Sequence, residues 1–284
     1  MINALTFDVE EYFHAEAFRQ VVRPEAWPTL ESRVAASTGR LLDLLGEAGV
    51  RATFFVLGWV AERQPALVRR IQAGGHELAC HGYGHEMITR LEREEFERDV
   101  RRGKAIIEDI TGAAVIGYRA PTFSVVRSTL WSLDVLAEAG FRYDSSVFPI
   151  VHDRYGIRDA PRFPHRRRVG TGAGIDEFPL STVERGRWRL PVAGGGYFRL
   201  LPYAMTRWAI RHLNQVEGQP AMVYLHPWEI DTDQPRLPVG RVTHLRHSVN
   251  TRTTQEKLLR LVKEVRFGPA RDVLAGRGLL KDAA

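Results

Sequence analysis

The sequence predicts an α/β fold with a largely parallel sheet, in which short apolar strands alternate with amphipathic helices. Over roughly the first half of the 284 residues, strand-like runs are separated by helical runs of about 10–15 residues. Glycines suited to ending a helix in the left-handed conformation follow these runs, at Gly49, Gly74, Gly112 and Gly140. Titratable side chains come directly after several of the strands. We therefore expect one barrel-like α/β domain with a polar rim at the carboxyl ends of its strands.

The elements of the first half follow from the spacing of apolar residues. Strand-like runs lie at residues 5–9, 51–58, 76–80, 114–120 and 141–147. Helical runs lie at about residues 37–48, 93–110 and 127–139. A further helical run after residue 58 contains Pro65, and we expect a new helix to begin there because proline fits the first turn.

The second half is less regular. Residues 150–174 are rich in Arg, Gly, Pro and His and are typical of a long loop or insertion. Residues 175–183 and 187–199 are expected to be strands around a glycine-rich turn, followed by a helix at about 203–216, a strand at 221–225 and a last helix at about 254–265. This pattern predicts a barrel over residues 1–230 with an irregular insertion at about 150–200, and a C-terminal extension over residues 231–284 that packs on the barrel.

The composition limits the function classes. Hydrophobic residues make up 44% and charged residues 26%, as in an ordinary globular protein. The single cysteine, Cys80, excludes an intrachain disulfide and fits a reducing compartment. We see neither a secretory signal before the first strand nor an apolar run approaching the ~20 residues of a membrane span, so we expect a cytoplasmic protein.

The net charge is +6, and the arginines concentrate at residues 162–168, RFPHRRR. A basic surface can attract nucleic acid, anionic lipid or an anionic glycan. A solvated basic loop is the more common explanation for such a run. No nucleic-acid-binding motif accompanies it, so we expect no nucleic-acid partner.

Five expected strand ends carry titratable groups. They are Asp8, Glu10 and Glu11 after the first strand, then His81 with His85, Arg119, Asp144 and His226. Ligands of parallel α/β folds bind at the carboxyl ends of the strands. The coincidence therefore predicts one site on one rim.

His81 and His85 have a spacing that suits a divalent metal, although an HxxxH pair alone is weak evidence and two surface histidines are the alternative. A carboxylate from the first strand would complete three ligands and leave one position open, as in catalytic metal sites. A second carboxylate would then accept a proton from the attacking water. Glu11 is expected to be a solvated loop residue.

His226 is either a structural histidine or a general acid, and the second role requires a carboxylate partner. Asp144 is the candidate partner, although Asp-Ser-Ser also fits a turn. Arg119 either clamps a catalytic carboxylate or makes a surface ion pair of little consequence.

In this order, the stretches TFDVE (6–10), HGYGH (81–85), RAPTF (119–123), YDSS (143–146) and YLHP (224–227) resemble the five motifs of NodB-homology polysaccharide deacetylases, carbohydrate esterase family 4. The resemblance spans about residues 4–230. It implies a distorted (β/α)7 barrel and a metal-dependent N-deacetylase that acts on N-acetylated amino sugars of a poly- or oligosaccharide. The alternatives are hydrolysis of a small or cyclic amide, as in allantoinase-like relatives, and a non-catalytic glycan-binding relative.

The resemblance also implies roles for individual residues. They are Asp8 as general base, Arg119 as the residue that orients it, His81 and His85 as metal ligands, the Thr122 N–H as oxyanion donor, His226 as general acid and Asp144 as the carboxylate that tunes this acid.

The motifs depart from the family pattern at several positions. Val9 stands where the family has a metal-binding Asp, so we expect Glu10 to be the third ligand, with Glu11 as the second choice. Zinc is the expected metal, with Co, Ni or Mn as alternatives. Gly82 replaces a hydroxyl residue that often braces the loop. Phe123 and Ser124 replace a Tyr/Gly pair, so the substrate groove is expected to differ.

The opening DVEEYFH (8–14), the stretch GGGYFRLLPY (194–203) and the C-terminal extension resemble deacetylases of bacterial exopolysaccharide gene clusters of the exosortase (PEP-CTERM) type. This implies a role in exopolysaccharide biosynthesis and peripheral association with an export system at the inner membrane face. Tyr197 is expected to stack on a sugar, with Phe123 and Trp228 as further substrate contacts. A plain hairpin turn is the alternative for residues 194–199.

Overall fold

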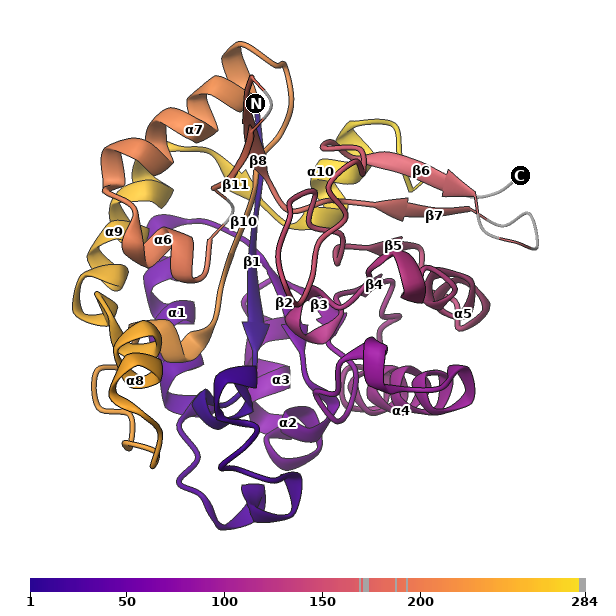
Figure 1. Ribbon diagram of the computed structural model, residues 1–284, viewed down its shortest axis with the longest axis vertical. Helices are drawn as coiled ribbons and strands as arrows, with labels where there is room; N and C mark the ends of the chain where they lie inside the picture. Colours follow the sequence, from indigo (N-terminus) through magenta and orange to yellow (C-terminus); the bar gives the residue numbers. More distant parts are fainter. Residues whose placement is uncertain (169, 171–173, 187, 193, 281–284) are drawn as a thin grey trace.

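One curved sheet with helices packed around it forms the centre of the computed structural model, which describes residues 1–168, 170, 174–186, 188–192 and 194–280 (Figure 1). The strand order is β10-β1-β2-β3-β4-β5-β7-β6, and β11 also pairs with β1. Neighbouring strands from β10 to β7 are parallel, while β6 is antiparallel to β7. The strands are β1 (Asn3–Val9), β2 (Thr53–Val56), β3 (Glu77–Cys80), β4 (Gly117–Tyr118), β5 (Tyr143–Asp144), β6 (His165–Arg168), β7 (Gly174–Glu177), β10 (Met222–Leu225) and β11 (Phe267–Gly268).

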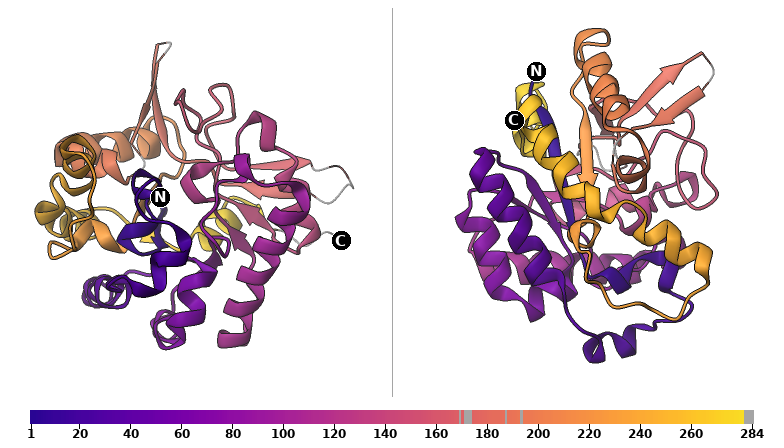
Figure 2. Two further views of the ribbon diagram at one scale, coloured as in Figure 1. Left: turned by 60° about the horizontal axis from the view of Figure 1, so that its bottom comes forward. Right: turned by 90° about the vertical axis from the view of Figure 1, so that its left-hand side faces the viewer.

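The helices cover the outside of this sheet, and the first-half helices form one flank (Figure 2). The helices are α1 (Val34–Ala48), α2 (Gly58–Arg63), α3 (Pro65–Ala73), α4 (Arg93–Thr111), α5 (Ser132–Glu138), α6 (Gly196–Leu200), α7 (Tyr203–Gln215), α8 (Arg241–Ser248), α9 (Thr251–Glu264) and α10 (Ala270–Gly276). The strands β8 (Thr182–Arg185) and β9 (Trp188–Pro191) make a separate hairpin. No helix within the described residues is long and apolar enough to cross a lipid bilayer.

The strand β1 is the central element that positions the site. All seven of its residues are buried, and Phe7 stacks on Phe54 of β2 with ring centroids 5.1 Å apart. Strand β10 pairs along its other edge, with Phe7 opposite Leu225. Because β1, β10 and β2 are parallel and in register, the residues that follow them lie at one rim of the sheet.

The α/β fold, whose curved sheet has seven parallel strands from β10 to β7 among the described residues, confirms the distorted barrel expected from the sequence. The predicted restart at Pro65 is confirmed, because α2 ends at Arg63 and α3 begins at Pro65. Gly49 and Gly112 end α1 and α4 with φ of 64° and 63°, the left-handed conformation that glycine adopts without steric cost.

Several local expectations were wrong. Residues 196–199, expected in a strand, begin the short helix α6, and β6 lies inside the expected loop of residues 150–174. Residues 169, 171–173, 187 and 193 of these two segments lie outside the described part of the chain. In the C-terminal extension, α9 packs against α1, and β11 adds to the sheet at β1. The domain boundary at residue 230 stays a prediction.

Candidate active site

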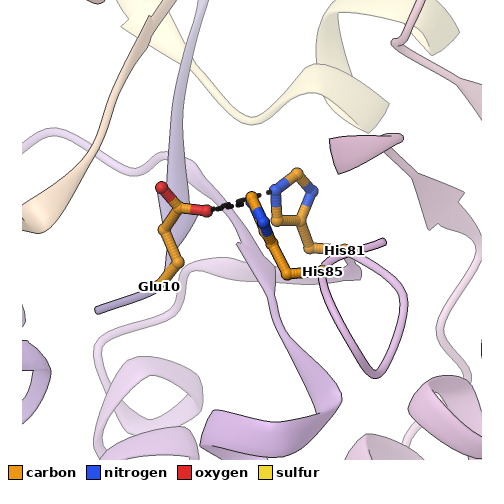
Figure 3. Close-up of side chains that lie close together, drawn as sticks. All are labelled: Glu10, His81 and His85. Carbon is orange, nitrogen blue, oxygen red and sulfur yellow. Dashed lines mark ion pairs between the residues drawn. The ribbon is translucent and has the colours of Figure 1, made fainter. Parts of the chain in front are cut away.

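Three buried side chains, Glu10, His81 and His85, converge at the rim where β1 and β3 end (Figure 3). Each offers one ligand atom, and these three atoms lie within 4.8 Å of one another. Glu10 Oε2 forms an ion-pair contact with His85 Nε2 and lies 3.8 Å from His81 Nε2. The structure therefore brings together the three residues that the sequence singled out for a metal.

The loop that carries the two histidines is held from helix α4. Asp99 accepts hydrogen bonds from the N–H groups of Tyr83 and Gly84, both at 2.8 Å. Gly82 has φ of 73°, and a Cβ on it would lie 2.6 Å from Asp99 Oδ2. The Asp99 carboxylate thus braces this loop. A side chain at position 82 would collide with this carboxylate, which explains why glycine stands there. Sequence reasoning missed Asp99, which lies on a charged helix face with no local motif.

The surroundings of the triad fit a divalent cation. His81 Nδ1 lies 2.8 Å from the Arg119 carbonyl, which only accepts hydrogen bonds, so Nδ1 carries the proton and Nε2 keeps its lone pair for the site. Glu10 Oε1 accepts a hydrogen bond from Trp228 Nε1 at 3.1 Å. Glu10 Oε2 is buried and lies against the Nε2 atoms of His85 and His81. A cation placed among these three atoms would be held by two imidazoles and one carboxylate.

The pKa values of the triad reflect burial and mutual attraction. Burial favours neutral Glu10, but the charges of His85, His226 and His81 outweigh it and lower the pKa of Glu10 well below its usual range. Burial lowers the pKa of His81 to about 4. Burial also acts against charge on His85, but Glu10 raises the pKa of that imidazole. Glu10 and His85 thus favour each other's charged forms, and a metal ion bound here would compete with protons for the same atoms.

Arg119 and Asp8 form a buried ion pair beside the triad. Arg119 is fully buried, and its Nη1 donates to Asp8 Oδ1 at 2.7 Å and to Thr6 Oγ1 at 2.8 Å. Its Nε donates to the Ser145 carbonyl at 3.0 Å, and its guanidinium lies 4.1 Å above the Phe55 ring. The alternative of a surface ion pair for Arg119 is thus excluded. The other oxygen, Asp8 Oδ2, lies 3.9 Å from His226 Nε2.

His226 has a carboxylate partner, but it is Glu229 and not the expected Asp144. His226 Nδ1 lies 2.6 Å from Glu229 Oε1, and Glu229 is fully buried on the 3-10 turn η7 (Pro227–Ile230). Burial alone would lower the pKa of His226. The hydrogen bond to Glu229 and the charges of Glu10, Glu229 and Asp8 instead raise it to about 9. The imidazole is therefore protonated near neutral pH, with Nε2–H facing the site.

Asp144 has a different set of contacts. It accepts hydrogen bonds from the side chain of Ser146 at 2.6 Å and from its N–H at 3.1 Å, and Ser146 Oγ in turn accepts the Ala120 N–H at 2.7 Å. The neighbouring Glu177 has a pKa well above its usual range because burial and the Asp144 charge both favour its neutral form. Asp144 thus supports the backbone that leads to Thr122, two residues after Ala120.

The Thr122 loop has a strained backbone. Thr122 and Phe123 have φ of 54° and 51°, a left-handed conformation that costs energy for residues with a Cβ and is often found at functional sites. In the part of the chain that the structure describes, no hydrogen-bond acceptor contacts the Thr122 N–H. This donor is available for a substrate oxygen.

Two family models match the sequence, each over just under half of its length. Residues 4–143 match a family model described as polysaccharide deacetylase, and residues 145–275 match one described as a domain of unknown function (DUF3473). Residues 4–143 are therefore a polysaccharide deacetylase domain. The match to the deacetylase model ends in the strand β5. His226 therefore lies in the segment that matches the domain of unknown function.

The curated relatives match part of their length. The chitooligosaccharide deacetylase of Rhizobium leguminosarum bv. trifolii is 38% identical over 103 residues, covering 36% of this chain and 45% of the relative. The peptidoglycan deacetylase of Helicobacter pylori is 32% identical over 156 residues, covering 55% of this chain and 48% of the relative. The aligned regions thus span about half of each of these two relatives.

A solved structure shares the fold over nearly the whole chain. A crystal structure from Mycobacterium smegmatis, titled as that of a polysaccharide deacetylase, superposes with a TM-score of 0.62 at 24% identity. The superposition covers 96% of this chain and 90% of that chain. The likeness therefore includes the segment after residue 143.

Glu11 is buried, which corrects the expectation of a solvated loop residue. Its carboxylate accepts hydrogen bonds from Ser32 Oγ and from the N–H groups of Arg33 at 2.9 Å and Val34 at 3.1 Å. These N–H groups are at the start of α1, where a helix has donors without internal partners. Glu11 therefore caps this helix and is turned away from the metal triad. Glu10 is the member of the pair that reaches the two histidines.

A groove of about 1170 Å³ opens beside the candidate active site. Thr122 and Trp228 line it, together with Arg154, Arg246 and His247. Of the three expected substrate contacts, Trp228 borders the groove, and its ring stacks on His226 with centroids 4.8 Å apart. The residues that line the groove in the described part of the chain do not include Phe123 or Tyr197.

The other two expected substrate contacts, Phe123 and Tyr197, lie in a cluster of aromatic side chains. Phe123 packs edge-on against Tyr224 and Phe148, and Tyr197 lies against the same Phe148. Direct stacking of Phe123 or Tyr197 on a sugar stays a prediction.

Part of the basic run at residues 162–168 is used inside the molecule. Arg162 makes a bidentate ion pair with Glu217, at 2.7 and 2.9 Å, and Arg166 pairs with the buried Asp176. The patch is therefore not simply a solvated basic loop.

Proposed function

We propose that this protein is a metal-dependent hydrolase that removes acetyl groups from N-acetylated amino sugars of a saccharide. The observation that carries the proposal is the meeting of a three-ligand set, a base and an acid at one rim. His226 Nε2 lies 3.9 Å from Asp8 Oδ2 and 3.8 Å from Glu10 Oε1. The names of the relatives, which are deacetylases of chitooligosaccharide and of peptidoglycan, support this substrate class.

Glu10, His81 and His85 would hold the cation, for which we propose zinc because two imidazoles and one carboxylate suit it. When bound, the cation would polarise the acetyl carbonyl and make the attacking water more acidic.

The residues of the chain account for the proton transfers. Asp8, held by Arg119, accepts a proton from the water as its oxygen bonds to the carbonyl carbon. The Thr122 N–H donates a hydrogen bond to the oxyanion of the tetrahedral intermediate. His226 Nε2–H then gives its proton to the amide nitrogen as the C–N bond breaks. Collapse of the intermediate releases the free amino sugar and acetic acid, which ionises to acetate. The cycle closes when Asp8 gives its proton to solvent and His226 takes one up from solvent.

We further propose that the reaction serves exopolysaccharide biosynthesis at the inner face of the membrane. This setting depends on the likeness of residues 8–14 and 194–203 to deacetylases of exopolysaccharide gene clusters. The test is deletion of the gene followed by measurement of the acetyl content of the secreted polysaccharide. An unchanged acetyl content would contradict this setting.

The activity itself is tested by acetate release from N-acetylated chito-oligosaccharides with zinc added. We expect Asp8→Asn to reduce turnover at least ~100-fold, since general base catalysis contributes about 10²–10⁴. The variant should keep its metal, because Asp8 lies outside the ligand set. Asp43→Asn, which changes an exposed ion pair with Arg70, is the matched control and should retain full activity. Normal turnover by Asp8→Asn would refute the assignment of the base.

A further inference from the structure

The glycine-rich segment Gly194–Arg199 is built against strand β10. Gly194 forms a parallel bridge with Tyr224, and the Gly195 N–H donates to the Tyr224 carbonyl at 2.9 Å. Gly194 has φ of 140°, and a Cβ there would lie 1.8 Å from the Tyr224 oxygen. Glycine is thus required for the approach. The helix α6 starts directly afterwards and carries Arg199, which reaches Glu229 of η7.

Arg199 is buried and its guanidinium is held by several acceptors. Its side chain is 4% exposed, and its Nε donates to Glu229 Oε2 at 2.7 Å. Its Nη1 donates to the carbonyls of His247 at 2.7 Å and Val249 at 3.0 Å. These carbonyls lie at the C-terminal end of α8, where unpaired carbonyls and the helix dipole favour a cation.

Glu229 lies between Arg199 and the proposed catalytic acid. One carboxylate oxygen accepts the Arg199 Nε–H, while the other accepts from the N–H of His226 at 3.1 Å and contacts its Nδ1 at 2.6 Å. A guanidinium bond to one oxygen fixes the rotation of the carboxylate, so the other oxygen stays in line with the imidazole. The chain Arg199–Glu229–His226 therefore ends at the Nε2 atom that faces Asp8 and Glu10.

We propose that Arg199 is a positioning residue for His226. Arg199 acts through Glu229 and thereby couples the C-terminal segment to the active site. This inference rests on the proposed function. The segment after residue 230 takes part directly, because Asn250 Nδ2 and Lys257 Nζ donate to the Arg199 carbonyl at 2.9 and 3.0 Å. The glycine-rich stretch thus serves to place an arginine behind the acid, whichever saccharide occupies the groove.

A kinetic test compares Arg199→Ala, Arg199→Lys and Glu229→Gln, each alone, and Arg199→Ala combined with Glu229→Gln. We expect Arg199→Ala to lower kcat by at least ~10-fold while KM stays within about threefold, because the loss affects proton donation in the transition state. Arg199→Lys, which keeps the charge, should recover part of kcat. The double variant should be no slower than the slower single variant, since both changes break the same chain of contacts.

The matched control is Arg162→Ala. Arg162 is also a mostly buried arginine that pairs with a carboxylate, with its side chain 8% exposed, but its partner is Glu217. This variant should lose stability without a change in kcat. Because Arg199 borders the groove, millimolar guanidinium should restore part of the activity of Arg199→Ala, whereas neutral urea should not. A kcat of Arg199→Ala within twofold of the wild type, or multiplying effects in the double variant, would overturn the inference.

A second readout does not need turnover. The short contact between His226 Nδ1 and Glu229 should give a strongly downfield Nδ1–H signal in the proton NMR spectrum, assigned by its loss in His226→Gln. We expect this signal to shift or broaden in Arg199→Ala and to persist in Arg162→Ala. If the wild type released no acetate, the proposed function would fail, but this signal would still test the inference. An unchanged signal in folded Arg199→Ala would overturn it.

Discussion

The buried ion pair of Arg119 and Asp8 allows a quantitative test of how the site is held together. At the observed 2.7 Å and an effective dielectric constant of about 20, the Coulomb attraction is about 6 kcal/mol. Taking each ion out of water costs several kcal/mol, so the net contribution of the pair is much smaller than this attraction. Removing one partner, however, leaves the other charge buried and uncompensated.

Replacing Arg119 by Met should therefore lower the free energy of unfolding by about 3–5 kcal/mol. Asp8→Asn keeps the shape and an acceptor oxygen for Nη1, so we expect a smaller loss of about 1–3 kcal/mol. In Arg119→Met combined with Asp8→Asn, neither charge remains. The double variant should thus be about 2–3 kcal/mol more stable than the sum of the single losses predicts.

The assay is urea unfolding of the four proteins in EDTA, so that metal binding does not add to the measured stability. The matched control is the cycle of Arg70→Met with Asp43→Asn. This pair has a similar distance of 2.6 Å, but its side chains are 52% and 66% exposed. Its coupling should be below about 1 kcal/mol. A coupling this small for Arg119 and Asp8 would refute the view that the base is held by a buried charge pair.

Three further predictions concern stability. Glu11→Ala should lower the free energy of unfolding by about 2–3 kcal/mol in urea while metal content stays normal, because it removes the cap of α1; loss of bound metal would contradict this role. Gly194→Ala should be destabilising by at least ~2 kcal/mol, and Gly46→Ala, exposed in α1 with open space around its Cβ position, should be neutral or stabilising; equal effects would contradict the backbone argument. Burial, then the Arg51 charge, lowers the pKa of His76 to about 4, so its neutral form stabilises the fold above about pH 6.5 and this contribution is lost as the pH falls towards 4. Between about pH 7.5 and pH 5, the free energy of unfolding of His76→Gln should therefore fall by about 2 kcal/mol less than that of the wild type. An equal fall in the two proteins would contradict this prediction.

The rim of the site could be predicted because parallel strands bring their ends together. Asp8 and His226 are far apart in the sequence, yet Asp8 is the second-last residue of β1, His226 directly follows β10, and the two strands pair in register. The choice of Glu10 as the third metal ligand could be predicted because Val9 cannot bind metal. Val9 points into the core, where it is fully buried. The alternation of side chains along an extended segment then directs the next residue to the opposite side.

The supporting contacts could not be predicted in the same way. Asp99 braces the histidine loop from the middle of α4, and Arg199 reaches Glu229 from another helix, so only the packed structure brings them near. Glu229 did leave a local signal, since it stands three residues after His226 and a single turn brings them together. Asp144 is hydrogen-bonded to its neighbour Ser146, and the carboxylate that contacts His226 is Glu229.

The metal site of Glu10, His81 and His85 is tested most directly by the zinc dependence of acetate release after treatment with EDTA, measured for the wild type and for Glu10→Ala. We predict that EDTA abolishes the wild-type activity and that one equivalent of zinc restores it. Glu10→Ala should need at least roughly 10-fold more zinc for any recovery. Full activity of the wild type without metal, or the same zinc requirement in Glu10→Ala, would contradict this metal site.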